Sequence, residues 1–349
     1  MNKLKIAVLF GGYSSEYNIS LQSAYSVITH LDINKYEPVL LGITSSGEWF
    51  RFSGDPSKIK DNTWCNPSDC VRAIISPSRE VHGVLEFDAG KIRAIRLDAA
   101  MPVLHGKNGE DGTVQGLLEL AGIPIVGCKT LASALCMDKD RAHKIAYAAG
   151  VRIPRSFILE NEVNEETALE KAGNIGYPLF VKPVRAGSSL GITKVLNRDE
   201  LLAAVKLAFT YDDKVIIEEN ISGFEVSCAV LGNDKLIVGE LGEIELAGGF
   251  FDYKEKYTPQ TYSFHVPARI PAKKAEEIKN TARIIYRALG CTGFARVDMF
   301  LTPSGEIVFN EVNTIPGFTT YSHYPHMLKA AGMTFEQIID TAIRLAVSE

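Results

Sequence analysis

Residues 294–313, FARVDMFLTPSGEIVFNEVN, carry two carboxylates and an amide at a spacing that could bind a metal ion. The alternating apolar residues predict a β-hairpin, and a two-residue turn at 304–305 would place Asp298 directly opposite Glu311. Asn313 would project from the same face, because strand side chains alternate with a period of two. Two facing carboxylates repel each other unless a cation lies between them, and an oxygen-only ligand set suits Mg²⁺. The hairpin therefore predicts a magnesium site.

The same register allows a simpler interpretation of this face. It places Arg296 opposite Asn313 and Pro303 opposite Glu306. In that alternative the polar residues form a solvated surface on which Arg296 pairs with Asp298. The strongly apolar character of both strands favours the bound ion.

A second candidate site lies in VKPVRAGSSLGITKV, where Lys182 stands at the end of a predicted buried strand. The turn that follows is rich in Gly and Ser, and backbone N–H groups of such a turn can hold phosphate while a lysine adds positive charge. The pattern is not a Walker A sequence, so an ordinary hairpin loop remains an alternative.

Two further polar residues and one loop stand where ligands commonly bind. His105 ends a predicted buried strand, and Glu16 directly precedes a predicted helix. As alternatives to ligand binding, His105 could be an ordinary core or exposed histidine, and Glu16 could be a carboxylate that stabilises the helix dipole. The long loop at 243–265 contains a cluster of aromatic residues and predicts a lid or binding loop, with surface packing as the alternative.

The elements that must position these residues follow an α/β pattern. LKIAVLF, a glycine-rich turn and an amphipathic helix open the chain as the first unit of an open sheet. Further buried strands are predicted for YEPVLLGI, DAAMPVLHG and IPIVG, and helices for 113–121 and 130–149. A smaller unit begins near Ser156, and a third contains a helix at 272–289 and the hairpin.

Composition limits the class of protein. With 349 residues, 46% hydrophobic and 23% charged, the chain should form two or three globular domains, and it has no apolar stretch long enough to span a membrane. The net charge of -5 gives no attraction to nucleic acid or anionic lipid. The scattered cysteines have no zinc-binding spacing and should be reduced thiols, mostly buried. We expect a cytoplasmic, unprocessed small-molecule enzyme.

Several segments together resemble the D-alanine:D-alanine ligase family of ATP-grasp enzymes. In chain order they are GGYSSEYNISL, HGKNGEDGTVQG, CMDKD, YPLFVKPVRAGSS, KEKY, FARVDMF and NEVNTIPGFTTYS. The resemblance covers essentially the whole chain. It implies a three-domain ATP-grasp fold of α/β and α+β class, with an open parallel α/β sheet in the N-terminal domain.

The resemblance also implies domain boundaries, cofactors and partners. The domains would be an N-terminal substrate domain at 1–128, a central ATP-grasp subdomain at 129–217 and a C-terminal ATP-grasp domain at 218–349, which holds the hairpin and the lid loop. The enzyme would use ATP and two Mg²⁺ ions, with Mn²⁺ as a substitute. It would act on D-alanine and D-serine as a homodimer, without nucleic acid or membrane partners.

Position by position, the resemblance assigns the nucleotide and metal contacts. The residues that would bind ATP are Lys139, Lys182, Ser189, Glu218, Glu219, Glu225 and Lys256. The lysines would meet phosphates, Glu218 and Glu219 the adenine, and Glu225 the ribose. The two Mg²⁺ ions would be held by Asp298, Glu311 and Asn313, in agreement with the hairpin.

The family's catalytic and substrate-binding roles map in the same way, onto Glu16, Tyr17, His105, Ser188, Tyr257, Arg296, Gly317, Ser322 and His323. Glu16 would hold the ammonium group of the first D-alanine and be linked through Ser188 to Tyr257. His105 and Arg296 would face that substrate's carboxylate. Ser322 would meet the carboxylate of the second substrate, and the Gly317 amide would stabilise the tetrahedral oxyanion.

The implied reaction has two steps. The carboxylate of D-alanine attacks the γ-phosphate of ATP to give D-alanyl phosphate, and the amine of the second amino acid then displaces phosphate. The product is a D,D-dipeptide for peptidoglycan precursors.

Two departures from the housekeeping pattern bear on the second substrate. Tyr17 follows Glu16 where a histidine is usual, and His323 stands where housekeeping ligases tend to have an aliphatic residue. The Lys256-Tyr257 pair is present, as in ligases that use amines, whereas D-lactate-using ligases usually lack it. The chain thus looks most like the D-alanine:D-serine ligases of vancomycin resistance. A housekeeping D-alanine:D-alanine ligase is the alternative, and an inactive nucleotide-binding regulator a remote one.

Overall fold

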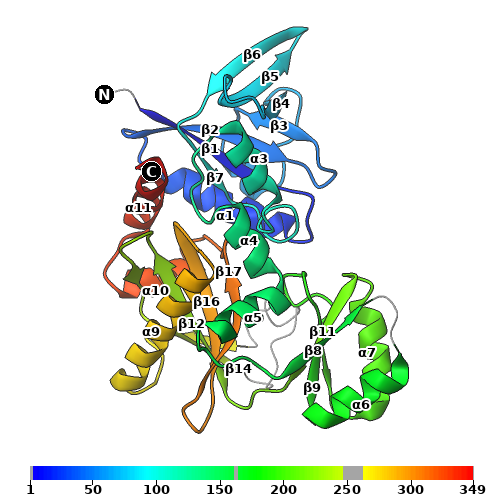
Figure 1. Ribbon diagram of the computed structural model, residues 1–349. Helices are drawn as coiled ribbons and strands as arrows, with labels where there is room; N and C mark the ends of the chain where they lie inside the picture. The colour runs from blue at the N-terminus through cyan, green and yellow to red at the C-terminus, as the bar shows by residue number, and fades with distance from the viewer. Residues whose placement is uncertain (1–2, 161–163, 247–261, 349) are drawn as a thin grey trace.

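The computed structural model describes residues 3–160, 164–246 and 262–348, and three β-sheets succeed one another along the chain (Figure 1). This agrees with the predicted combination of α/β and α+β architecture. None of the helices in these ranges has the length and apolar character needed to cross a bilayer.

The first sheet has seven strands in the order β6-β5-β4-β3-β2-β1-β7. Their bounds are β1 Leu4–Gly11, β2 Tyr36–Ile43, β3 Trp49–Phe52, β4 Cys70–Ile75, β5 Gly83–Asp88, β6 Lys91–Arg96 and β7 Ala99–Pro102. β1 pairs in parallel with β2 and β7, as expected for an open α/β sheet, and the other pairings are antiparallel. The sheet is therefore mixed, because tight turns such as Ala89-Gly90, with φ of 46° and 78°, join neighbouring strands.

Both faces of this sheet are covered by helices. Alternate residues of β1 point to opposite sides: Ile6 and Val8 pack with helix α1 (Tyr17–His30), whereas Ala7 and Leu9 share a core with helix α3 (Thr113–Ala121). A short helix, α2 (Ser57–Lys60), lies beside α1. The IPIVG segment contributes only an isolated bridge between Ala100 and Ile125, and not a full strand.

The predicted single helix at 130–149 is two helices, α4 (Thr130–Met137) and α5 (Lys139–Ala148). They break at Asp138, whose backbone is extended and whose carboxylate accepts a hydrogen bond from the Arg141 amide at 3.0 Å. Such an N-cap supplies an acceptor to the otherwise unsatisfied first turn. The break makes Lys139 the first residue of α5.

The second sheet has four antiparallel strands in the order β10-β9-β11-β8. The strands are β8 Ser156–Glu160, β9 Leu179–Pro183, β10 Thr193–Val195 and β11 Lys214–Glu219. Helices α6 (Glu165–Ile175) and α7 (Leu201–Ala208), with the 3₁₀ turn η1 (Arg198–Glu200), cover one face and share its apolar core.

The third sheet is antiparallel and has the order β15-β14-β12-β16-β17, with β13 paired to β12. The strands are β12 Phe224–Leu231, β13 Ile237–Val238, β14 Gly242–Leu246, β15 Tyr262–His265, β16 Phe294–Leu301 and β17 Ile307–Asn313. Helix α9 (Ala272–Ala288) packs on it, as do α4 and α5.

The β16–β17 hairpin corrects one prediction and confirms another. The two-residue turn was wrong: Thr302, and not Pro303, faces Glu306, so the loop has three residues and ends at Gly305 with φ of 84°. A register shift between Asp298 and Met299 leaves Asn310 as an extra residue on β17. This bulge restores the predicted pairing at the functional end of the hairpin, where Asp298 faces Glu311.

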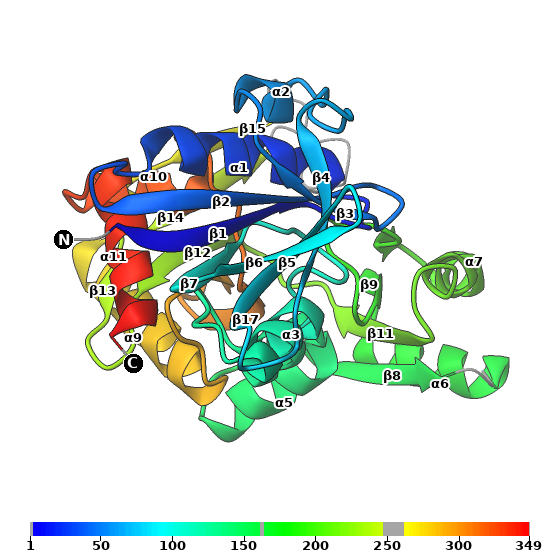
Figure 2. The same cartoon turned by 90° about the horizontal axis from the view of Figure 1, so that it is seen from above.

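The C-terminal helices α10 (His323–Ala330) and α11 (Phe335–Val347) connect the first and third sheets. Helix α11 lies beside the first sheet (Figure 2). Its Ile338 and Ile343 share a core with Ile6 of β1 and with Phe294 of β16. Apolar cores contain residues from both sides of the predicted domain boundaries at 128/129 and 217/218. These boundaries therefore stay a prediction.

The cysteines agree with the expectation of reduced thiols. All six are free, and four of them are buried. Cys136 and Cys291 lie 3.7 Å apart, sulfur to sulfur, inside the core beneath the third sheet.

Candidate active site

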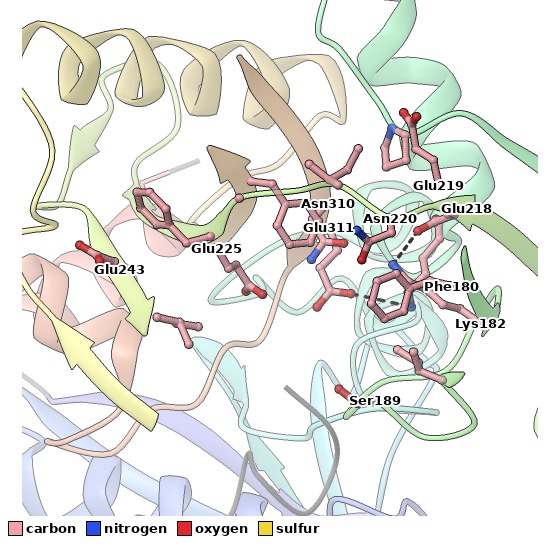
Figure 3. Close-up of a pocket in the computed structure, with 18 of the residues that line it drawn as sticks. Phe180, Lys182, Ser189, Glu218, Glu219, Asn220, Glu225, Glu243, Asn310 and Glu311 are labelled. Atoms are coloured by element: carbon pink, nitrogen blue, oxygen red, sulfur yellow. Dashed lines mark ion pairs between the residues drawn. The ribbon is translucent and has the colours of Figure 1, made fainter. Parts of the chain in front are cut away.

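A cavity of about 430 Å³ opens between the second and third sheets. Seven of the residues predicted to bind ATP or metal line it: Lys139, Lys182, Ser189, Glu218, Glu219, Glu225 and Glu311. Figure 3 shows that several of these side chains come from separate elements, with Lys182 on β9, Glu218 on β11 and Glu311 on β17. We call this the nucleotide cavity.

Two lysines place positive charge in the nucleotide cavity. The Lys182 ammonium is 2.6 Å from a Glu218 carboxylate oxygen, and both side chains are at least nine-tenths buried. Lys139 donates a hydrogen bond to the Ala186 carbonyl at 2.9 Å and lies 3.8 Å from Glu311. Because Lys139 begins α5, the break at Asp138 is what directs it to this cavity.

The two predicted adenine contacts differ in their surroundings. Glu219 accepts hydrogen bonds from the Arg155 amide and guanidinium, each at 2.9 Å. Glu218 is buried, which by itself raises the pKa of its carboxyl, but the positive charge of Lys182 outweighs this effect and helps to hold the pKa below its usual range. Glu218 is therefore an ionised acceptor inside the cavity wall.

A second cavity, of about 350 Å³, adjoins the first and shares Glu225 and Ile244 with it. Its lining brings together most of the predicted catalytic and substrate-binding residues, namely Glu16, His105, Ser188, Arg296, Gly317, Ser322 and His323. The metal-ligand candidate Asn313 also lines it. We call this the substrate cavity.

Glu16 is held from two sides in the substrate cavity. The Ser188 hydroxyl donates a hydrogen bond to its carboxylate. The backbone of Gly106 lies so close that an added Cβ would overlap the Glu16 carboxylate, and a Cβ on Gly187 would lie 2.9 Å from it. Gly106 also has a φ of 74°, a conformation that favours glycine.

His105 is buried, and both ring nitrogens are engaged. Nδ1 lies 2.8 Å from the Ile315 carbonyl, so Nδ1 must carry the proton and donate. Nε2 then accepts from the Ser23 hydroxyl at 3.1 Å. Burial lowers the pKa of His105, which agrees with a neutral ring. A direct bond from His105 to a substrate carboxylate would require it to release Ser23.

Arg296 and Asp298 form the ion pair that the simpler interpretation of the hairpin anticipated. The guanidinium donates from Nε at 2.9 Å and from Nη2 at 2.8 Å. Although burial by itself lowers the pKa of Arg296, the Asp298 carboxylate raises it above the ordinary value. Asp298 is fully buried and also accepts hydrogen bonds from Ser227 at 2.6 Å and Asn313 at 2.8 Å.

The fit to Mg²⁺ differs among the three candidate ligands. Glu311 lines the nucleotide cavity and Asn313 the substrate cavity, so their oxygens suit a cation between the two spaces. Asp298 can join them only if Arg296 or Asn313 releases one of its oxygens. In the described parts of the chain no three His, Cys, Asp or Glu side chains form a metal cluster.

The far end of the substrate cavity is formed by the segment before α10 and by the helix start. Gly317 lies against Ser322, whose hydroxyl accepts a hydrogen bond from the Thr319 amide at 3.0 Å. The His323 ring stacks on Phe264 with centroids 3.7 Å apart and an interplanar angle of 10°. A polar ring is thus fixed at the cavity wall.

One predicted residue, Tyr17, lies at neither cavity among the described residues. The Tyr17 hydroxyl accepts a hydrogen bond from the Trp64 indole at 2.9 Å and donates to Asn62 at 3.2 Å, and Tyr17 is not among the described residues that line the cavities. Lys256 and Tyr257 lie outside the described residues.

Two residues of the site, the half-buried Glu110 and the buried His143, were missed by sequence reasoning. Glu110 lines the substrate cavity and accepts a hydrogen bond from the Gly106 amide at 3.0 Å. Burial, with help from Glu16, raises the pKa of Glu110 to about 8. Glu110 belongs to the HGKNGEDG segment that carries the family resemblance, so that motif could have pointed to it. His143 stands behind Glu218, and no pattern in the sequence distinguishes it from an ordinary helix residue.

Comparisons with known proteins agree with this geometry. Two family models match, one described as the N-terminus of D-ala D-ala ligase over residues 5–128 and one as its C-terminus over residues 147–344. The VanG D-Ala:D-Ser ligase from Enterococcus faecalis superimposes with a TM-score of 0.92 at 55% sequence identity, covering 99% of this chain and 100% of that one.

Curated relatives include enzymes of more than one specificity. A D-alanine–D-alanine ligase from Caldicellulosiruptor bescii is 44% identical and covers 100% of this chain and 96% of its own length. The vancomycin B-type resistance protein VanB from Enterococcus faecalis is 45% identical and covers 99% of each chain.

Proposed function

Because the chain belongs to the D-alanine–D-alanine ligase family of ATP-dependent ligases, we propose that it joins D-alanine to D-serine. The observation that carries the choice of D-serine is the 55% identity to a D-Ala:D-Ser ligase over the full length of both chains. The dipeptide would enter peptidoglycan precursors and alter the target of vancomycin. We also propose a cytoplasmic homodimer, as the family resemblance implies.

The proposed first step uses residues from both cavities. Glu16 holds the ammonium group of D-alanine, and Arg296 orients its carboxylate towards the nucleotide cavity. Lys139 and Lys182 neutralise charge on the phosphates of ATP while D-alanyl phosphate forms. Mg²⁺ bound by Glu311 and Asn313, with Asp298 if Arg296 releases it, would supply further charge neutralisation.

The proposed second step takes place at the end of the substrate cavity near α10. Ser322 binds the carboxylate of the acceptor, whose amine attacks the acyl carbon. Arg296 and the Gly317 amide stabilise the developing oxyanion. The attacking amine must be unprotonated, so dipeptide synthesis should rise across roughly pH 7 to 9, because an α-amino group has a reference pKa near 8.

His323 supports a hydroxyl-bearing acceptor. A hydrophobic pocket rejects an added hydroxyl only about 10²-fold, whereas a site built to hydrogen-bond that hydroxyl rejects its absence about 10⁴-fold or more. Selection of D-serine therefore needs a polar group at the acceptor end, and the stacked His323 imidazole is one. D-Lactate should be a poor acceptor, because the Lys256-Tyr257 pair is that of amine-using ligases.

The deciding experiment is product analysis with ATP, Mg²⁺ and D-alanine in the presence of an equal concentration of D-serine. We expect D-alanyl-D-serine to be the main product and D-lactate, in a separate reaction, to be used poorly. Mainly D-alanyl-D-alanine would support the housekeeping alternative, which the 44% identity to a D-alanine–D-alanine ligase favours. ATP hydrolysis without any ligated product would support the inactive regulator.

A further inference from the structure

Residues 314–318 follow strand β17, and part of this segment lines the substrate cavity. In the proposed function its Gly317 amide binds the oxyanion of the second step. Gly317 is half-buried at the cavity, whereas the other four residues are buried. Within the described residues no acceptor is bonded to the Gly317 amide. The segment therefore offers one backbone donor to the cavity.

Two polar side chains from the N-terminal part of the chain hold this segment on either side of Gly317. His105 donates from Nδ1 to the Ile315 carbonyl at 2.8 Å. The Ser23 hydroxyl accepts a hydrogen bond from the Phe318 amide at 3.2 Å and donates to His105 Nε2 at 3.1 Å. Ser23 lies on α1, is fully buried and lines the same cavity. The three bonds thus join Ile315 to Phe318 through two side chains.

The bonded backbone groups belong to the two peptide planes that flank the plane of the Gly317 N–H. The Ile315 carbonyl belongs to the plane before it, and the Phe318 amide to the plane after it. Because each peptide unit is planar, only rotations at Pro316 and Gly317 can turn the plane between them. The proline ring fixes one of these rotations, but glycine is conformationally permissive. Anchoring both flanking planes therefore fixes the direction of the Gly317 donor.

Packing of the Phe318 ring does not replace these bonds. The ring is buried and lies against Phe294, with centroids 5.4 Å apart. Such a contact holds the side chain, whereas a hydrogen bond is directional and orients the backbone amide. Without the Ser23 hydroxyl, the Phe318 amide and His105 Nε2 would both lose a buried partner, which is costly. The backbone on this side of Gly317 would then turn towards other partners.

We propose that Ser23 is a positioning residue that, together with His105, directs the Gly317 N–H at the oxyanion of the second step. This inference rests on the proposed role of the Gly317 amide. Donors that already point at the developing charge need no reorganisation at the moment of reaction, and their contribution to catalysis is correspondingly large. In this role Ser23 acts through Gly317 and not by contact with the substrate.

Ser23→Ala tests the proposal by steady-state kinetics with D-serine and, separately, with D-alanine as the acceptor. Removal of a complete oxyanion donor costs about 10²- to 10³-fold in kcat, so misdirection of one should cost about tenfold or more. KM for the first D-alanine should change less than about threefold. Ser23→Cys keeps a group of similar size that forms only weak hydrogen bonds, and its kcat should lie between those of wild type and Ser23→Ala. If Ser23→Ala unfolds, Ser23→Cys provides the same comparison.

Ser20→Ala is the matched control for the loss of a buried hydroxyl from α1. Ser20 precedes Ser23 by three residues and is equally buried. Its hydroxyl accepts a hydrogen bond from the Gly11 amide at 2.8 Å and donates to the Val103 carbonyl, at the ends of β1 and β7. Thermal unfolding should show similar losses of stability in both alanine variants, but Ser20→Ala should keep kcat within about threefold. An equal fall in kcat would assign the effect to α1 as a whole and overturn the positioning role.

Positional isotope exchange separates the two steps of the reaction. Reversible formation of D-alanyl phosphate scrambles an oxygen-18 label from the β–γ bridge of ATP, because the β-phosphate of bound ADP can rotate before ATP forms again. Ser23→Ala should exchange the label at the wild-type rate or faster, since its first step is intact. A loss of exchange as large as the loss of kcat would place the damage in the first step and overturn the proposal.

The remaining outcomes distinguish this inference from the proposed function. If Ser23→Ala keeps kcat within about threefold while the wild-type protein makes dipeptide, the positioning role is overturned and the ligase function stands. If kcat is kept and KM for D-alanine falls, His105 binds the substrate once Ser23 releases it, and the positioning role is again overturned. A wild-type protein that makes no dipeptide with either acceptor would overturn the proposed function and, with it, this inference.

Discussion

The Ser188 hydroxyl donates a hydrogen bond to the carboxylate of Glu16, across 172 positions of sequence. Glu16 directly precedes α1 beside the first sheet, and Ser188 lies in the loop after β9 of the second sheet. Ser188 adopts a positive φ of 51°, a conformation that costs energy for a residue other than glycine. The bond therefore ties the proposed amine-binding group to the glycine- and serine-rich turn beside the nucleotide cavity.

Gly106→Ala should weaken binding of the first D-alanine, because its Cβ would displace the Glu16 carboxylate. Loss of one hydrogen bond to a charged group costs about 1.5 to 3 kcal/mol, so KM for D-alanine should rise roughly 10- to 100-fold. Gly90→Ala is the control, with a similar φ of 78° but no atom within 4 Å of the added Cβ. The measurement is KM for D-alanine in both variants by steady-state kinetics. Equal KM values would show that the close approach of Gly106 to Glu16 does not affect binding of D-alanine.

Glu311→Gln should remove most ATP-dependent ligation and leave the fold intact, since its charge serves the proposed Mg²⁺ site and not the core. Glu306→Gln, on the same hairpin but at its exposed turn, should retain wild-type activity. Activity is measured over a Mg²⁺ titration, with thermal unfolding as the folding check. Near-normal turnover with an unchanged Mg²⁺ requirement would remove Glu311 from the ligand set.

His323→Leu should shift the acceptor preference from D-serine towards D-alanine by about tenfold or more. His326→Leu is a matched control, because both histidines lie on α10 and contact Phe264, but only His323 is among the described residues that line the substrate cavity. The ratio of kcat/KM values for the two acceptors is the measurement. A ratio that moves equally in both variants would point to packing of α10 as the cause.

Glu110 should make the protein less stable as pH rises. Its pKa in the folded chain is about 8, raised first by burial and then by Glu16, against an ordinary value of 4.5. Between these values the folded state holds the proton more tightly than the unfolded state, so the free energy of unfolding falls with pH by up to about 1.4 kcal/mol per pH unit. The contribution is complete below pH 4.5 and lost above pH 8.

Glu110→Gln should flatten this pH dependence, because the amide is neutral throughout. Urea unfolding at pH 5, 7 and 9 measures the slope for wild type, Glu110→Gln and the exposed control Glu80→Gln. Parallel slopes for wild type and Glu110→Gln would show that the Glu110 carboxyl is not protonated in the folded protein.

The hairpin shows how much of the site can be predicted from the local sequence pattern. Alternation of apolar and polar residues was sufficient to place Asp298 and Glu311 on one face, because the period of two fixes which side chains share a face. The turn and the bulge at Asn310 were not predicted. They offset each other in the register, so a wrong turn gave the right pairing at the functional end.

The sequence by itself also determined the α/β start of the chain and, through the family resemblance, the group of residues that lines the two cavities. These features follow from local periodicity and from motifs whose residues are close in sequence. The position of Lys139 required the helix break at Asp138, because a capping carboxylate in an otherwise helical pattern is hard to distinguish from an ordinary polar residue.

Only the tertiary structure decided which distant groups meet. Glu110 has its high pKa because the fold desolvates it and places Glu16 nearby, and His143 of α5 comes within 3.6 Å of Glu218 of β11. Tyr17 stands next to Glu16 in sequence, yet its hydroxyl turns to Trp64. Periodicity specifies the face on which a side chain lies, whereas burial, desolvation and the choice of partner arise only when sheets from separate parts of the chain pack together.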